Sequence, residues 1–180
     1  MSRPYKYVGP RRLADLAMSD IERAEPKSEA EFALWLSANY NEAAVTLTYV
    51  VTRGGALRVS DRHSEHVACA RGEAVLGAGE LSLLVDGDAV EVESVTNQST
   101  GYCPEPDCFP EVAAALAGAG LVPPAGFSHE FLFRRCTSCL GINLVKDGDF
   151  ECATCGVELP RRWNFADDDV QDRRLDGGAP

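Results

Sequence analysis

The spacing of apolar residues predicts two helices at the start of the chain, after an extended arm over residues 1–10. The first helix is expected over residues 10–23, because Pro10 suits the first position of a helix. Its apolar residues recur three or four positions apart: Leu13, Leu16, Ala17 and Ile21. The second helix is expected over residues 28–41, where Ser28 and Glu31 have the spacing of a capping box.

The second predicted helix carries one apolar face. The residues on this face are Phe32, Trp35, Leu36 and Tyr40. In one interpretation both helices pack on the sheet that follows them. In the other, the face around Trp35 binds a partner.

From Ala44 onward the apolar pattern becomes that of β-strands. Residues 45–52 are rich in β-branched side chains, and further strands are expected over residues 56–60, 67–70, 74–85 and 89–95. Gly77 and Gly79 interrupt the longest strand, which predicts a bulge or a close approach of two backbones. The strands together predict an antiparallel β-meander of four or five strands.

A third helix is predicted after a proline-rich loop, from Asp107 or Glu111 to Ala117. The predicted fold class is α+β, with N-terminal helices packed on the meander and a small C-terminal metal-binding ribbon. The expected parts are an arm with two helices, the meander with its helix, the ribbon, and a disordered acidic tail: residues 1–43, 44–122, 129–166 and 167–180.

The C-terminal ribbon is predicted from two Cys-x2-Cys pairs. The pairs are Cys136 with Cys139 and Cys152 with Cys155, and twelve residues separate them. Two such pairs supply four thiolates to one tetrahedral ion, for which zinc is the expected occupant, one per chain and structural in role. Residues 142–145 have a strand pattern, residues 146–149 form its turn, and Phe150 begins the expected return strand. Iron is an alternative ion for the same four thiolates, and disulfides are a second use of these cysteines.

Composition and charge narrow the classes of function. The formal net charge of −11 argues against broad nucleic-acid binding and against anionic membranes. The first ten residues lack the apolar core of a signal peptide, and seven cysteines are an odd number. These features predict a protein of the reducing cytosol. The abundance of Ala, Gly, Arg and Asp indicates a bacterial source rich in G and C.

Unusual polar residues lie within the predicted meander. A glutamate within an apolar strand, Glu80, must face solvent, pair with another group or line a pocket. His63, Glu80 and Tyr102 are the catalytic candidates, and Ser64, Asn97 and Ser99 are candidate ligand-binding residues. The alternative is that these residues only hydrogen-bond loops to one another. Cys103 and Cys108 are free thiols, a disulfide or ligands of a second metal.

Part of the meander resembles a known module over residues 57–116. The matching positions are His63-Ser64, Gly72, Val75, Ala78-Gly79-Glu80, Asn97, Ser99, Tyr102 and Pro104. This order is similar to that in the C-terminal region of plant calmodulin-binding IQ-motif protein M and in bacterial toxin-like proteins. Those relatives have Gly-His before the tyrosine where this chain has Thr100-Gly101, so their histidine is missing here. The resemblance implies a β-meander fold and, through the toxin-like relatives, a nucleotide-type ligand.

Two hypotheses for the function follow. In the first, the ribbon presents a surface to a protein partner and the chain is an interaction or regulatory module. Arg134, Arg135, Arg161 and Arg162 flank the cysteines and would balance thiolate charge or contact an acidic partner. In the second, the chain is an enzyme or a small-molecule-binding protein that uses the site around His63, Glu80 and Tyr102.

Overall fold

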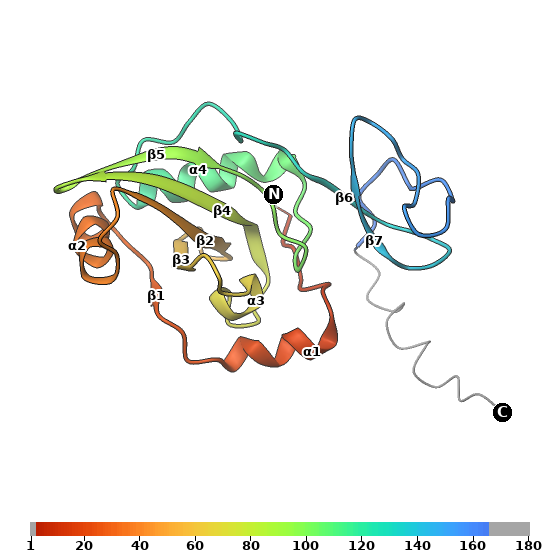
Figure 1. The fold of residues 1–180 in the computed structure, drawn as a ribbon, viewed down its shortest axis with the longest axis horizontal. Helices are drawn as coiled ribbons and strands as arrows, with labels where there is room; N and C mark the ends of the chain where they lie inside the picture. Colours follow the sequence, from red (N-terminus) through yellow and green to blue (C-terminus); the bar gives the residue numbers. More distant parts are fainter. Residues whose placement is uncertain (1–2, 166–180) are drawn as a thin grey trace. The chain divides into compact units, whose positions relative to one another are not determined.

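The computed structural model of the chain describes residues 3–165 and has a mixed α+β fold, as predicted (Figure 1). It divides into two compact units, residues 1–131 and residues 132–180. The predicted acidic tail, residues 167–180, lies outside the described residues. No helix among the described residues has the length and apolar character that crossing a membrane requires.

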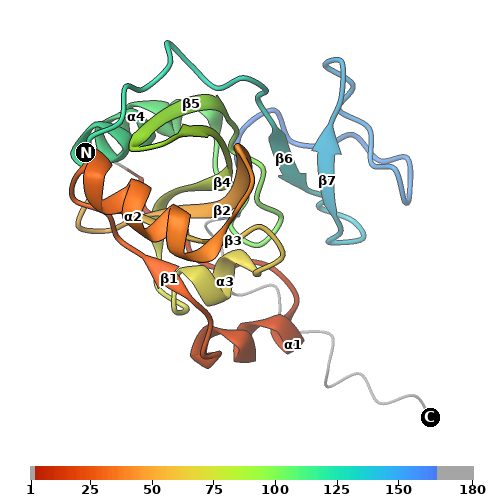
Figure 2. The same ribbon diagram turned by 60° about the vertical axis from the view of Figure 1, so that its left-hand side comes forward.

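The first unit is built on a five-stranded antiparallel sheet, whose curvature is visible in Figure 2. The strands follow one another across the sheet in the order β1-β3-β2-β4-β5. Their bounds are β1 Arg23–Ala24, β2 Ala44–Thr52, β3 Leu57–Asp61, β4 Val75–Asp86 and β5 Ala89–Val95. Four of these strands were predicted within a residue or two of their observed bounds. The antiparallel sheet is therefore confirmed, with one further strand.

The strand order differs from that of a simple meander. In a simple meander β4 would pair with β3. Here β4 pairs with the other edge of β2, and β1 pairs with the outer edge of β3. The connection from β3 to β4 contains the short helix α3, His66–Cys69. The prediction of a strand over residues 67–70 was wrong. These residues are all buried, and a short run of buried residues does not distinguish helix from strand.

The first helix is shorter than predicted. It consists of α1, Arg11–Ala14, and the 3₁₀ turn η1, Asp15–Met18. Ser19 then turns to extended backbone with ψ of 137°. Farther on, the Arg23 guanidinium donates to three backbone carbonyl oxygens: Ser19, Ile21 and Ala68. Apolar spacing had predicted a helix as far as residue 23. These bonds and the pairing of β1 with β3 explain why the backbone after η1 is extended instead.

The second helix, α2, spans Glu29–Asn39, close to its predicted range. Ser28 caps it, since its Oγ accepts from the backbone N–H of Glu31 at 3.2 Å. Phe32 and Leu36 are fully buried, and Glu29 accepts from the backbone N–H of Val90 in β5. Trp35 is half-buried. The apolar face of α2 thus packs on the sheet.

A third helix, α4, spans Phe109–Gly118 after the 3₁₀ turn η2, Pro106–Cys108 (Figure 1). It packs against β2, β3 and β4. Val112 and Leu116 on α4 have no exposed surface. A Cβ at Gly77 would come within 2.7 Å of the Val112 side chain. The absence of a side chain at Gly77 therefore lets α4 approach the sheet closely.

The backbone crosses itself most closely at Gly79. A Cβ at this position would overlap the carbonyl oxygen of Thr96, in the segment that follows β5. The same Thr96 oxygen accepts a hydrogen bond of 2.8 Å from the hydroxyl of Tyr49, which is fully buried. The close backbone approach predicted from the glycines of β4 is therefore confirmed at Gly79, and the predicted bulge corresponds to the shift of register between β2 and β4 next to Gly77.

The second unit begins with a hairpin of two antiparallel strands, β6 Leu132–Arg135 and β7 Ile142–Val145. Strand β7 has the predicted bounds. The turn after β7 has positive φ at Asp147 (52°) and Gly148 (73°), as a two-residue type I′ turn requires. The predicted return strand from Phe150 is reduced to an isolated bridge between Glu151 and Glu158.

Replacing Gly79 by alanine tests the backbone crossing. We expect Gly79→Ala to lower the free energy of unfolding by about 3 kcal/mol, because the new methyl group would overlap a backbone oxygen that has little room to move. Denaturant titration of the protein measures the change.

Gly118→Ala is the matched control, since a Cβ there would meet no atom within 4 Å. This variant should be neutral or more stable by up to about 1 kcal/mol, because alanine favours the helix. Equal stability of the two variants would contradict the crossing at Gly79.

Candidate metal centre

The first Cys-x2-Cys pair forms the turn that joins β6 to β7. The N–H of Cys136 donates to the carbonyl of Gly141 at 2.9 Å, and the N–H of Leu140 donates to the carbonyl of Cys136 at 3.0 Å. Leu140 has φ of 64°, a conformation that favours glycine. The left-handed residue is thus Leu140 itself and not the neighbouring Gly141. These two backbone hydrogen bonds close the turn on which both cysteines lie.

The second Cys-x2-Cys pair repeats this backbone arrangement. The N–H of Gly156 donates to the carbonyl of Cys152 at 2.9 Å, and the N–H of Cys152 donates to the carbonyl of Val157. Gly156 directly follows the pair, as Leu140 follows the first, and has φ of 70°. In both turns the residue after the second cysteine therefore reverses the chain in the left-handed conformation.

The two turns bring the four predicted ligands together. The sulfur atoms of Cys136, Cys139, Cys152 and Cys155 all lie within 4.8 Å of one another. The Cys136 and Cys155 sulfurs are 3.5 Å apart, and the Cys139 and Cys152 sulfurs are 3.6 Å apart. Four sulfurs about 2.3 Å from a tetrahedral zinc ion would be about 3.8 Å from each other. The four cysteines form one candidate metal site whose spacing and donor set fit zinc.

The sulfur spacing argues against disulfides. A disulfide requires sulfurs about 2.05 Å apart, and all seven cysteines of the chain are free thiols in the structure. A tetrahedral set of four thiolates also accommodates iron. The geometry therefore supports a bound metal over a disulfide, whereas the donor set admits both zinc and iron.

Backbone N–H groups around the sulfurs favour the thiolate that a metal requires. The N–H groups of Ser138 and Cys139 point at the Cys136 sulfur at 3.4 and 3.5 Å. The Cys139 N–H is the main cause that lowers the pKa of Cys136. The N–H of Thr154 likewise lowers the pKa of Cys152 to about 6. The turns therefore prepare two of the four ligands for metal binding even before an ion is present.

A small apolar cluster supports the site from within the ribbon. It consists of Cys136, Val145, Cys152 and Leu159, with Leu132, Cys139 and Phe150 packed against it. The Arg161 guanidinium lies 4.3 Å from the centre of the Phe150 ring, so the arginine covers this side of the cluster. Four cysteines occupy all four coordination positions of a tetrahedral ion, so no position is left for a water or a substrate.

The four arginines near the cysteines have different environments. Arg134 is buried and donates to the backbone carbonyls of Phe133 and Arg161. Arg135 donates to the carbonyl of Leu140 and lies over the Phe165 ring. Arg161 and Arg162 are exposed, and Arg161 pairs with Glu158 at 3.5 Å. Arg134 and Arg135 thus support the backbone of the ribbon, while Arg161 and Arg162 face solvent.

The three catalytic candidates lie in different surroundings. His63 is exposed, and its backbone N–H donates to the Asp61 carboxylate. Glu80 is half-buried on β4 opposite Thr48 of β2. Tyr102 is fully buried, and its hydroxyl donates to the carbonyl of Glu73 at 2.9 Å. Within residues 3–165 no hydrogen bond or ion pair joins one of these candidates to another.

The candidate ligand-binding residues bond to the backbone of nearby loops. The Asn97 amide donates to the carbonyls of Pro104 and Phe131 and accepts from the N–H of Phe131. Ser99 accepts from the backbone N–H of Tyr102, and the carbonyl of Ser64 accepts from the Thr48 hydroxyl. Asn97 and Ser99 are also buried. Their surroundings match the alternative in which they hold loops together.

The segment before the ribbon is fastened to the end of β5. The Ser128 N–H donates to the carbonyl of Val95 at 2.9 Å, and the Ser128 hydroxyl accepts from the N–H of Val95. Thr96 then forms a parallel bridge with His129. Together with the Asn97 bonds to Phe131, these contacts give residues 128–131 a defined path along the sheet.

The cysteines of the first unit do not belong to this group of potential metal ligands. Among the described residues, the groups of three or more potential metal ligands reduce to the four ribbon cysteines. Cys103 donates its thiol to the carbonyl of Thr100, and burial raises the pKa of Cys108 to about 12. Both are free thiols, as one of the three predicted alternatives stated.

His66 is a titratable group that the sequence did not single out. Its Nε2 lies 3.0 Å from the carbonyl oxygen of Gly79, which can only accept, so Nε2 carries the proton. Burial lowers the pKa of His66 to about 4, against the opposing effect of this hydrogen bond. The sequence around His66 does not predict this contact, because its partner, the Gly79 carbonyl, lies on β4 and is brought near α3 only by the fold.

Removing one cysteine tests the metal site. We expect Cys152→Ser to lose its metal and to unfold residues 132–165, because three thiolates hold an ion far more weakly than four. Metal analysis of the purified wild-type chain should give one ion per chain, and the variant should give none.

Cys103→Ser is the matched control, because its hydroxyl can keep the bond to Thr100. This variant should keep one ion per chain. Metal retained in Cys152→Ser, or two ions in the wild-type chain, would contradict the assignment of the four ligands.

The pKa of His66 predicts a dependence of stability on pH. The folded value of about 4 lies below the ordinary value of 6.5, so the unfolded chain takes up the proton first as the pH falls. Stability should therefore be lost from pH 7 downward, by about 2 kcal/mol at pH 5. Thermal unfolding across this range, compared between the wild-type chain and His66→Gln, measures the contribution. Metal release affects both proteins and cancels in the comparison, and identical pH profiles would contradict the prediction.

Neither the comparison with protein-family models nor the comparisons with curated proteins and with solved structures find a match to the chain. The resemblance to IQ-motif protein M and the toxin-like proteins therefore stays a prediction. The antiparallel sheet and the four-cysteine cluster are what the structure supports of it.

Proposed function

We propose that the chain is an interaction module in which a structural zinc ion shapes the ribbon and the ribbon contacts a protein partner. The observation that carries this proposal is the closed set of four thiols at Cys136, Cys139, Cys152 and Cys155. Four protein ligands leave zinc no open coordination position, so the ion stabilises a surface and performs no reaction.

The small size of the ribbon supports a structural ion. Its buried cluster contains four residues, of which two are themselves cysteine ligands. So small an apolar cluster cannot balance the conformational entropy that the segment loses on folding. Zinc binding contributes about 10–16 kcal/mol in comparable four-ligand sites. The ion therefore supplies most of the stability of the ribbon.

The ribbon surface favours a protein over a nucleic acid. Residues 132–165 contain five basic and four acidic side chains, and the four thiolates outweigh the charge of a bound zinc ion. Residues 1–131 contain ten basic and nineteen acidic side chains, so they repel polyanions. The ribbon also exposes two aliphatic side chains, Leu144 at 37% and Val157 at 39%. Partly exposed aliphatic groups among charges suit a protein contact.

The alternative is an enzyme or small-molecule-binding protein that uses His63, Glu80 and Tyr102, and it stays a prediction. The buried Tyr102 hydroxyl already donates to a backbone carbonyl, so it offers no free group to a ligand in this conformation. His63 and Glu80 remain accessible. The interaction hypothesis agrees with more of the contacts, and it is the one we adopt.

Charged substitutions on the ribbon surface test this function. The zinc-loaded full chain would be immobilised to capture proteins from a bacterial lysate, with and without the double substitution Leu144→Asp and Val157→Asp. We expect the double variant to capture at least about tenfold less of the specific partner, because unpaired charges buried in the contact oppose association.

Val122→Asp is the matched control, since Val122 is an exposed aliphatic residue of the first unit, at 84%. It should capture the same partner as the wild-type chain, and all three proteins should hold one zinc ion. Equal capture by all three would exclude these ribbon side chains from the contact.

A further inference from the structure

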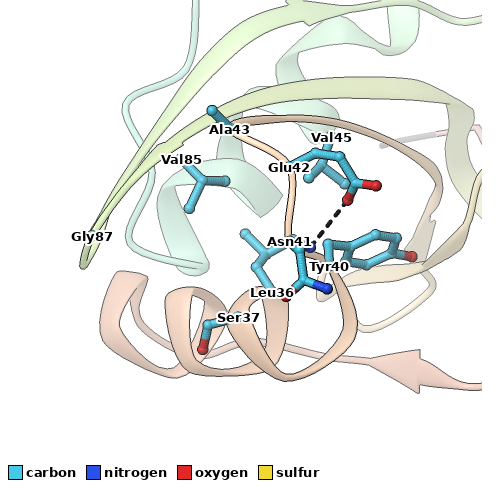
Figure 3. Close-up of a pocket in the computed structure, with 9 residues that line it drawn as sticks. All are labelled: Leu36, Ser37, Tyr40, Asn41, Glu42, Ala43, Val45, Val85 and Gly87. Carbon is cyan, nitrogen blue, oxygen red and sulfur yellow. Dashed lines mark hydrogen bonds between the residues drawn. The ribbon is translucent and has the colours of Figure 1, made fainter.

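Two neighbouring hollows lie on the first unit beside the loop that joins α2 to β2. The first has a volume of about 360 Å³ and the second about 270 Å³. Tyr40, Glu42 and Val45 line both of them. Figure 3 shows the first hollow between the end of α2, the loop of residues 40–43 and the turn after β4. Its volume is near the lower end of the range for small-molecule sites.

The first hollow has an apolar floor. Leu36 and Val45 are almost completely buried, and Val85 of β4 is half-buried beside them. Figure 3 shows the three aliphatic side chains gathered between the helix and the sheet. An aliphatic chain of a few carbons lying against them would remove apolar surface from water on both sides.

A single formal charge lines this hollow, and it is negative. Among the residues that line it, Glu42 is the one acidic side chain, and no Lys, Arg or His is present. The backbone N–H of Asn41 donates to one Glu42 carboxylate oxygen at 3.0 Å, which leaves the second oxygen to a ligand (Figure 3). A carboxylate held in this way beside an apolar floor complements a positive charge attached to a hydrocarbon chain.

The C-terminal end of α2 adds to the negative potential of the hollow. The helix has eleven residues and ends at Asn39, and Ser37 and Tyr40 of this end line the hollow. The negative end of the helix dipole favours cations within its last turn. The first-unit surface as a whole is acidic, which also raises the local concentration of cations.

The second hollow differs in charge. It shares Glu42 with the first hollow and adds Asp61, Arg62 and His63, so its charges are mixed. The Tyr40 hydroxyl donates to the Asp61 carboxylate at 3.4 Å, and the Tyr40 ring packs edge-on against Trp35. Tyr40 is therefore held in place where the two hollows meet, and a cation is favoured in the first hollow, where Glu42 is the one charged lining residue.

We propose that the first hollow binds an aliphatic ammonium group. The hydrocarbon chain lies on Leu36, Val45 and Val85, and the ammonium nitrogen donates to the Glu42 carboxylate. The same chemistry is presented by a free aliphatic amine and by a lysine side chain. The site lies in the first unit and does not depend on the zinc ribbon as an interaction surface.

The test is a titration of the zinc-loaded full chain with n-butylammonium, followed by the amide resonances of the protein in two-dimensional NMR. Saturable shifts are expected at Tyr40, Asn41 and Gly87, with a dissociation constant of about 1 mM. Butyrate and 1-butanol share the hydrocarbon chain without the positive charge, and they should bind at least about tenfold more weakly.

Variants locate the charge that binds the amine. Glu42→Gln should weaken n-butylammonium binding about tenfold, because it removes the one lining carboxylate and keeps the shape. Glu130→Gln is the matched control, with the same change of net charge at an exposed glutamate outside the hollow, and it should leave the affinity unchanged. Nα-acetyl-lysine amide and 1,4-diaminobutane then distinguish a lysine side chain from a free diamine by which of the two binds more tightly.

Three results would overturn the proposal. The first is the absence of saturable shifts up to about 50 mM n-butylammonium. The second is equal binding of n-butylammonium and 1-butanol, which would show that charge plays no part. The third is equal weakening by Glu42→Gln and Glu130→Gln, which would reduce the effect to net charge.

Discussion

The meeting of four sulfur atoms within 4.8 Å is the constraint on which the structure of residues 132–165 depends. Two turns, supported by only a small apolar cluster, must place their thiols at the corners of one tetrahedron. The left-handed backbone at Leu140 and Gly156 and the N–H groups directed at sulfur both serve that placement. Strands β6 and β7 are short because they only have to position the first turn.

The first unit depends on a different constraint, the close approach of backbones around β4. Gly77 admits α4 to the face of the sheet, and Gly79 admits the chain that follows β5. The second crossing also fixes His66, whose ring nitrogen bonds to the Gly79 carbonyl. Helix α4, the segment after β5 and helix α3 are thus all positioned by two residues without side chains.

The sequence predicted the four cysteines that cluster and most strands, because their signals are local. Cysteine spacing determines which thiols face one another within a turn, and β-branched residues over 45–52 favour a strand wherever it pairs. The order of strands was not predictable, because nothing in the sequence shows whether β4 pairs with the free edge of β2 or with that of β3. Strand β1 has two residues, and it exists because Arg23 and Ala24 pair with β3 at a distance in sequence.

The polar candidates show the same limit. A buried asparagine in a loop has the same appearance in sequence whether it binds a ligand or a backbone. Asn97 is occupied by Pro104 and Phe131, and Tyr102 by Glu73, and these partners lie far enough along the chain to escape a local pattern. His63 instead opens into the second hollow with Tyr40 and Asp61, neighbours that depend on the path of α2.

Asn97 has a mechanical consequence for the segment that leads into the ribbon. Its amide forms two bonds to Phe131, the last residue of the first unit, and a third to Pro104. Any pull on the ribbon would reach the sheet along residues 128–131, where the Ser128 and His129 contacts with the end of β5 lie. Such a force would act on the hydrogen bonds between the Asn97 amide and Phe131 before it reached the core, so this side chain would resist the tension first.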